Sequence, residues 1–131
     1  MDYILVKSKS REELIDITDE LAEYIKSKDY NNGILYLFVP HTTAGLTINE
    51  NADPSVRKDI NNTLNKLIPH INNYTHLEGN SDAHIKATLV GSSNFVFIER
   101  KELVLGTWQG IYFCEFDGPR NRKLYLKFTS L

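Results

Sequence analysis

The amino-acid sequence has few of the features that identify a particular class of protein. Its 131 residues include one cysteine, Cys114, so neither an intramolecular disulfide nor a four-cysteine zinc site can form within the chain. Lysine and arginine number 15 against 17 aspartate and glutamate, which gives a formal net charge of −2. Because nucleic acids and anionic membranes are bound through clustered positive charge, we expect neither as a partner.

Long apolar runs are also missing. No stretch approaches the roughly 20 apolar residues that a membrane helix requires. The segment from Met1 to Lys7 has neither the basic start nor the apolar length of a signal peptide, so we expect a cytoplasmic chain. A chain of this size can bury roughly two thirds of its unfolded surface in one core, which predicts a single domain over residues 1–131.

The first half of the sequence shows patterns of both strands and helices. Alternation predicts a strand over Tyr3–Lys9, and the capping-box spacing of Ser10 and Glu13 predicts a helix that runs to about Ser27. The apolar run Ile34–Val39 predicts a strand that is covered on both faces. The small and polar residues that follow, 42–50, indicate an active-site loop or a short strand.

The second half predicts two more helices and then β structure. Asp53 and Pro54 have the residue types of a helix start, and Pro69 should stop that helix. A shorter helix is expected from Ser81 to Gly91. Strand patterns follow at Phe95–Ile98, Trp108–Phe116 and Lys123–Thr129. Strands in two groups with helices between them predict an α+β fold with two to three helices.

Common catalytic signatures, such as a P-loop or a nucleophile elbow, are absent, but polar residues gather in three clusters. The densest runs from His76 to His84 and includes Glu78, Asn80 and Asp82. With His41, its two imidazoles would supply three nitrogen ligands for a divalent metal. The alternative is that these histidines bond to backbone in a loop and at a helix start, with Asp82 helping to cap the helix.

The other two clusters suggest a phosphate site. Thr42 and Thr43 lie beside a glycine, and their hydroxyl and backbone N–H groups suit an anionic oxygen, although an ordinary turn would use them equally well. Arg120 and Arg122 occupy a tight turn, where they bind phosphate or are simply solvated. Glu115 interrupts an apolar run and needs a cationic or metal partner unless its strand faces water. Cys114, on the other side of that strand, is expected to pack in the core.

Taken together, these clusters resemble those of the YjbQ-type proteins, also called secondary thiamine-phosphate synthases. The resemblance spans nearly the whole chain and rests on six strings: His41-Thr-Thr-Ala-Gly-Leu46, Asn49-Glu-Asn-Ala-Asp-Pro54, His76-x-Glu-Gly-Asn80, Asp82-Ala-His-Ile-Lys-Ala87, Leu105-Gly-Thr-Trp-Gln-Gly110 and Glu115-x-Asp-Gly-Pro-Arg120. One departure is Lys101, which stands where the family usually has a glycine.

The resemblance implies a compact β-sandwich-like α+β fold with mixed sheets, assembly as a homotrimer, and a low thiamine-phosphate synthase activity. At the positions that match the family, we infer catalytic roles for His41, Glu50, His84 and Glu115. We assign His41, His76 and His84 to binding of a zinc or magnesium ion or to proton transfer. A small phosphorylated substrate would contact the remaining polar positions, which are Thr42, Thr43, Asn80, Gln109, Arg120 and Arg122.

Three functions are compatible with these expectations. The first is a transferase that joins hydroxymethylpyrimidine diphosphate to thiazole phosphate and releases diphosphate. The second is a metal-assisted hydrolase or other phosphate-handling enzyme, and the third is a non-catalytic trimer that binds a phosphorylated metabolite. Both enzymatic interpretations require the histidines and arginines to share one cavity.

Overall fold

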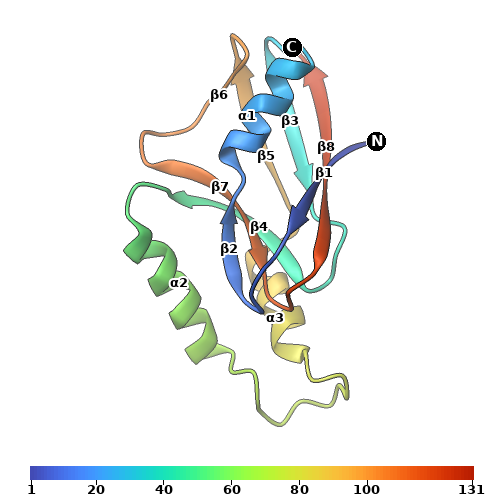
Figure 1. The fold of residues 1–131 in the computed structure, drawn as a ribbon, viewed down its shortest axis with the longest axis vertical. Helices are drawn as coiled ribbons and strands as arrows, with labels where there is room; N and C mark the ends of the chain where they lie inside the picture. The colour runs from blue at the N-terminus through green and yellow to red at the C-terminus, as the bar shows by residue number, and fades with distance from the viewer.

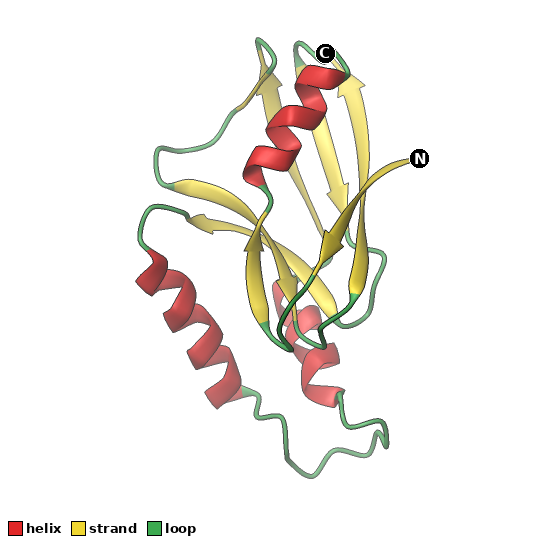
Figure 2. Ribbon diagram, viewed as in Figure 1, coloured by secondary structure: helices red, strands yellow, loops and turns green.

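Two antiparallel sheets and three helices make up the computed structural model, which describes residues 1–131 (Figures 1 and 2). The five-stranded sheet has the order β1 (Asp2–Lys7), β8 (Asn121–Ser130), β3 (Gly33–Phe38), β5 (Ser93–Glu99) and β6 (Glu102–Leu103). The three-stranded sheet has the order β2 (Glu13–Asp16), β7 (Gln109–Glu115) and β4 (Ala44–Glu50). The helices are α1 (Thr18–Ser27), α2 (Pro54–Leu67) and α3 (Ser81–Val90).

The main core lies between the two sheets, which confirms the expected α+β sandwich. Strand β7 shows the alternation that builds it, because Ile111 and Phe113 belong to this core whereas Tyr112 and Cys114 pack on the opposite face. Buried residues of α1, such as Leu21, join the main core, and α2 and α3 cover the other face of the three-stranded sheet. None of the helices is both long and apolar enough to cross a membrane.

The first predicted helix was wrong over its N-terminal half. Residues 13–16 form β2, and Leu14 pairs with Cys114 of β7, so helix α1 begins only at Thr18. The capping-box spacing is nevertheless used, because the Glu13 carboxylate accepts the backbone N–H of Ser10 at 2.8 Å. This hydrogen bond closes a turn before β2. Packing against β7 outweighs the helical pattern of residues 13–16.

The prediction that the run Ile34–Val39 is covered on both faces was also wrong for a single chain. Leu35 and Leu37 are buried, but Tyr36 and Phe38, which point to the other side, are 45% and 47% exposed. The helices pack elsewhere, so the outer face of the five-stranded sheet has no cover within the chain. We call this the outer sheet face; its other large exposed residues are Tyr3, Leu5, Phe95 and Phe97.

Several local predictions were confirmed. Asp53 caps α2, accepting the backbone N–H of Ser55 at 2.9 Å, and the helix ends at Leu67, just before Pro69. The segment interpreted as a loop or short strand is β4. Lys101, which stands where the family usually has a glycine, has a φ of 65°, so the chain adopts a left-handed conformation there without glycine.

Candidate functional site

Three connecting segments meet beside the start of α3 (Figure 1). Their side chains line a polar cavity. One segment joins β3 to β4, one precedes α3, and one joins β7 to β8. The cavity measures about 510 Å³ and has no hydrophobic residue in its lining, which consists of Pro40, His41, Thr42, Thr43, His76, Glu78, Asn80, His84, Asp117, Arg120 and Arg122. The three polar clusters of the sequence therefore share one cavity, and the lining includes every predicted site residue except Glu50, Gln109 and Glu115.

Arg122 is the buried cation of this cavity, with 4% of the residue exposed. Its Nε donates to Glu115 Oε1 at 2.9 Å, and its Nη2 donates to Glu115 Oε2 and, at 2.8 Å, to Thr43 Oγ1. These bonds fix the guanidinium and leave Nη1 without a protein partner. One donor nitrogen of a firmly held arginine is thus available to a ligand.

Glu115 lies behind Arg122 and is fully buried. Its carboxylate also accepts the Ser8 hydroxyl at 2.7 Å and the backbone N–H of Asp117 at 3.0 Å. Burial by itself raises the pKa of Glu115, but the hydrogen bonds from Arg122, Ser8 and the Asp117 N–H outweigh it, so the net pKa is below its ordinary value. With its oxygens occupied by these bonds, Glu115 holds Arg122 in place, and its predicted catalytic role stays a prediction.

Ser8 is a component of the site that the sequence did not reveal. It is buried, and besides binding Glu115 its hydroxyl accepts the backbone N–H of Arg120 at 2.8 Å. The hydroxyl therefore connects the end of β1 to the β7–β8 turn. A single serine between lysines at the end of a strand has no local signal of such a role, because its partners are more than 100 residues away along the chain.

Arg120 lies at the rim of the cavity, where 53% of its side chain is exposed. Its Nε donates to the backbone carbonyl of Asp117 at 2.7 Å, and its Nη2 donates to Asp117 Oδ2 at 2.9 Å. The same Asp117 oxygen accepts Asn80 Nδ2 at 2.9 Å. Asp117 therefore joins the arginine turn to the residue immediately before α3.

His41 enters the cavity as a neutral donor. Its Nε2 accepts the backbone N–H of Lys123 at 2.9 Å, which assigns the imidazole proton to Nδ1 in the neutral form. Burial, followed by the charge of Arg122, lowers the pKa of His41 below its ordinary value. At neutral pH the remaining ring nitrogen is therefore an N–H donor.

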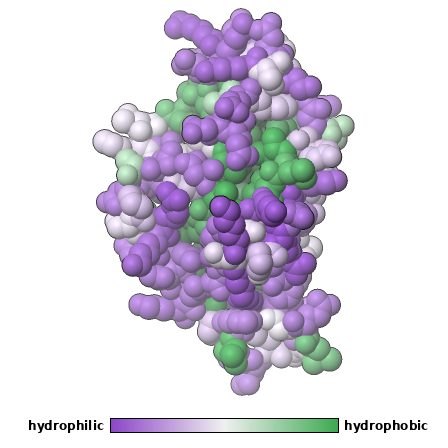
Figure 3. Space-filling model, viewed as in Figure 1, coloured by the Kyte–Doolittle hydropathy of each residue, from purple (hydrophilic) through white to green (hydrophobic).

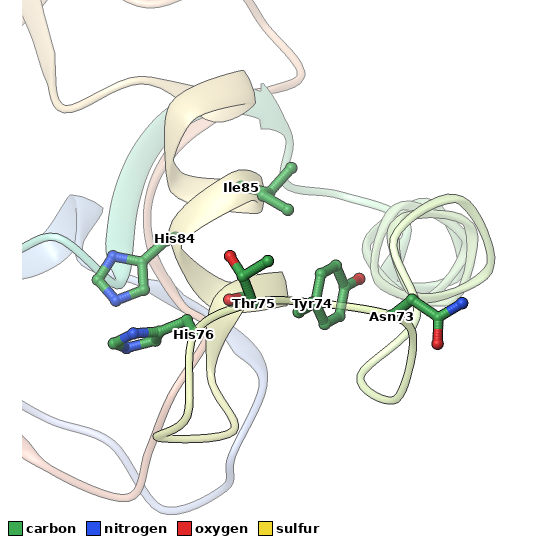
Figure 4. A pocket seen from close by; sticks show the side chains of 7 residues that line it. Asn73, Tyr74, Thr75, His76, His84 and Ile85 are labelled. Atoms are coloured by element: carbon green, nitrogen blue, oxygen red, sulfur yellow. The ribbon is translucent and has the colours of Figure 1, made fainter.

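His76 and His84 form an edge-to-face pair whose ring centroids are 5.6 Å apart (Figure 4). His84 comes from α3, and His76 comes from the segment that precedes it. Both rings also line a second cavity of about 540 Å³, which contains Tyr74 and Ile85. His76 and His84 thus lie between the polar cavity and the second cavity, whose wall includes an aromatic and an aliphatic side chain.

The predicted metal site does not match this arrangement. A site made by His41, His76 and His84 needs three nitrogen lone pairs that converge on one point. The Nε2 lone pair of His41 is used by the Lys123 amide, and no group of three or more His, Cys, Asp or Glu side chains is arranged to hold a metal ion. The described side chains therefore do not fit a three-histidine metal centre.

Glu50 and Gln109 lie away from the cavity. They pair with each other at one end of the β4–β7 ladder, whereas Ala44 and Glu115 pair at the other end. The two ends are six residue steps apart along the strand, or roughly 20 Å at about 3.3 Å per residue. Glu50 accepts the N–H of Ala52, and Gln109 accepts the N–H of Gly106. The structure therefore does not bring these two predicted site residues to the cavity.

An ionic network under α3 fixes the helix that carries His84. Asp82 is fully buried and receives two hydrogen bonds from Arg11, at 3.0 and 3.1 Å. Burial raises the pKa of Asp82, but the hydrogen bonds and charge of Arg11 outweigh it and leave a lowered pKa. Lys86, with 1% of its side chain exposed, lies 3.4 Å from Glu12 and 3.9 Å from Asp82. Asp82 thus anchors the helix through Arg11; the i,i+4 spacing of Asp82 and Lys86 was a usable signal for their pairing.

Comparisons with known proteins place the chain in one family. The family model "UPF0047 protein YjbQ-like" matches residues 2–130. The chain is 57% identical to UPF0047 protein MJ1081 of Methanocaldococcus jannaschii over 125 residues, which covers 95% of this chain and 91% of that protein. It is 48% identical to UPF0047 protein YugU of Bacillus subtilis over 126 residues, which covers 95% and 96%.

Solved structures agree with this placement. A YjbQ/UPF0047-family protein of Clostridium acetobutylicum has a TM-score of 0.94 and 49% identity, and the match covers 98% of this chain and 100% of that one. The conserved hypothetical protein TT1486 of Thermus thermophilus has a TM-score of 0.92 and 38% identity, with 98% and 100% covered. The chain therefore belongs to the YjbQ-like UPF0047 family.

Proposed function

We propose that this protein is a transferase that binds a small phosphorylated substrate in the polar cavity. The reaction that fits the family resemblance is thiamine-phosphate synthesis, in which hydroxymethylpyrimidine diphosphate and thiazole phosphate are joined and diphosphate is released. The supporting observation is the donor nitrogen Nη1 of Arg122, which faces no protein acceptor in a cavity that also contains Arg120, His41 and Thr42.

The donors of this cavity suit a departing diphosphate. Arg122 is held by Glu115 and Thr43, so it does not have to be reorganised when a ligand binds. Arg120 adds a second guanidinium at the rim, and His41 adds an N–H donor. Because charge accumulates on the leaving group as its bond breaks, preorganised donors of this kind lower the barrier.

The adjoining cavity supplies a place for a ring. Tyr74 and Ile85 give it an apolar wall, and His76 and His84 are common to both cavities. A pyrimidinylmethyl diphosphate would lie across them, with its reacting carbon near the two histidines. The carbon–oxygen bond breaks with both electrons leaving on diphosphate, and the thiazole nitrogen uses its lone pair to form the new carbon–nitrogen bond. This joining step transfers no proton, so the imidazoles act as hydrogen-bonding and positioning groups.

We also propose that the protein assembles as a homotrimer through the outer sheet face. Phe38, Phe95 and Phe97 on this face are between 47% and 50% exposed in the single chain. A contiguous aromatic surface of this kind marks an interaction site. The face shown in Figure 3 is mostly hydrophilic around a hydrophobic group at its centre. Sedimentation equilibrium should give three times the 15.1 kDa of the chain, and Phe38→Glu should shift the protein toward monomer.

The activity is tested by following thiamine-phosphate formation from the two purified substrates. Arg120→Ala should lower kcat/KM by on the order of tenfold or more, because it removes a charge-assisted contact to phosphate. Arg100→Ala, which changes an exposed arginine outside the cavity, is the matched control. His84→Ala should abolish turnover without unfolding the protein.

The same assay separates the three functions. Release of diphosphate without the joined product, and only with added divalent metal, would favour the metal-assisted hydrolase. Tight binding of the diphosphate ester without any reaction would favour a binding protein. Equal rates for Arg120→Ala and wild type would remove the polar cavity from the reaction.

A further inference from the structure

Asn80 has an unpaired acceptor in the wall of the polar cavity. The residue is 9% exposed, and its Oδ1 is buried without a hydrogen-bond partner. The only other buried side-chain atom in this state is Arg57 Nε, outside the cavity. Because a buried polar group without a partner is costly, such an oxygen indicates a partner that the protein itself does not supply.

Asn80 lies at the start of α3, where its side-chain oxygen could have bonded to the helix backbone. Asn80 is the residue immediately before α3, where asparagine normally uses its side-chain oxygen to accept a helix N–H. Here no such cap bond forms. Instead, Nδ2 donates to Asp117 Oδ2, which fixes the amide and leaves Oδ1 as the free end. The Asn80 side chain is therefore fixed by Asp117 and does not contribute a capping hydrogen bond to α3.

The surroundings of Asn80 differ from those of Arg122. Arg122, Arg120 and His41 present donors, which form the donor half of the cavity. Asp117 Oδ2 already accepts Arg120 and Asn80, whereas Asn80 Oδ1 has no partner. A phosphate group satisfies only the donor half. The Asn80 oxygen would be satisfied by a ligand that also bears a hydrogen-bond donor.

We propose that Asn80 is the specificity residue of the cavity, and that its Oδ1 accepts a hydrogen bond from a nitrogen donor on the phosphorylated ligand. The ligand class is therefore a phosphate or diphosphate ester that carries an amino group. This inference rests on the proposed function, since it assumes that phosphate occupies the donor half.

The experiment compares phosphate esters that differ only in the nitrogen. Isothermal titration calorimetry is performed with 2-aminoethyl phosphate against n-propyl phosphate, and with 3-aminopropyl phosphate against n-butyl phosphate. Each pair has equal chain length, and the second pair allows for a longer reach. Wild type should bind the better amino ester on the order of tenfold more tightly than its alkyl partner, as expected for a hydrogen bond from a charged donor.

Variants of Asn80 test whether its Oδ1 causes the preference for amino esters over alkyl esters. Asn80→Ala should reduce the preference, taken as the ratio of the amino-ester affinity to the alkyl-ester affinity, to threefold or less. Loosening of Arg120 through Asp117 would weaken both esters alike and leave this ratio unchanged. Asn62→Ala, an exposed asparagine of α2, is the matched control and should keep the full preference. Circular dichroism and thermal unfolding verify that each variant is folded.

The outcomes of these titrations separate the role of Asn80 from the presence of a phosphate site. Alkyl phosphates that bind as tightly as amino phosphates to wild type would overturn the role of Asn80 and leave the phosphate site intact. The role is equally overturned if Asn80→Ala retains the full preference. If wild type binds none of the four esters, both this inference and the proposed function fail.

Discussion

The buried pair of Glu115 and Arg122 leads to the most demanding prediction. Glu115→Gln keeps the shape of the side chain but removes its charge, which leaves the guanidinium of Arg122 buried beside a neutral amide. Removing one partner of a buried ion pair costs about 3 kcal/mol or more. The free energy of unfolding of a chain of this size falls by about 1.5 kcal/mol for each 1 M of urea, so the urea concentration at the unfolding midpoint should fall by about 2 M.

The sign of the pH dependence follows from the lowered pKa of Glu115. A carboxyl whose pKa is lower in the folded state stabilises the protein fully above the unfolded-state pKa, about 4.3, and this contribution is lost as pH falls through the folded-state pKa. The difference between wild type and Glu115→Gln should therefore be largest at neutral pH and shrink below about pH 4.

A double variant provides the control for this prediction. In Glu115→Gln/Arg122→Met no buried charge remains at this pair, so the double variant should be more stable than Glu115→Gln alone even though it carries more changes. Unfolding is followed by tryptophan fluorescence and circular dichroism at one protein concentration, because assembly would shift the midpoint. A loss below 1 kcal/mol for the single variant, or a double variant that is less stable still, would refute the assignment of Arg122 as a buried charge that depends on Glu115.

Other predictions concern groups around the site. NMR titration should show His41 gaining its proton only below the ordinary histidine pKa of about 6.5, and a normal pKa would contradict its burial beside Arg122. Burial raises the pKa of Cys114 to about 12, so a thiol reagent at pH 8 should label it only after denaturation. Asp82→Asn should destabilise the protein by about 2 kcal/mol in urea unfolding, because it weakens the buried pair with Arg11; no change would disprove that anchor. Treatment with a chelator should leave the binding of alkyl phosphates unchanged, and lost binding would show that a metal holds them.

The sequence predicted well what depends on neighbouring residues. Asp53 and Pro54 mark the start of α2 because the groups that satisfy a helix end lie within a few positions. Alternation in residues 123–128 identifies β8, with Leu124 and Leu126 buried as the pattern requires. The helix predicted over residues 13–16 was wrong, because pairing of these residues with β7 overrides their helical spacing.

For the candidate site, the sequence determined which polar groups are present and the tertiary structure decided their geometry. Histidines, arginines and threonines in short clusters were enough to predict a phosphate ligand, because these donor types suit anionic oxygens. Only the fold shows that Glu115 is used up in holding Arg122, that Ser8 belongs to the site, and that Gln109 is remote from it. The reason is physical: a residue type sets which bonds a side chain can form, but which partner it meets depends on contacts between segments that are far apart along the chain.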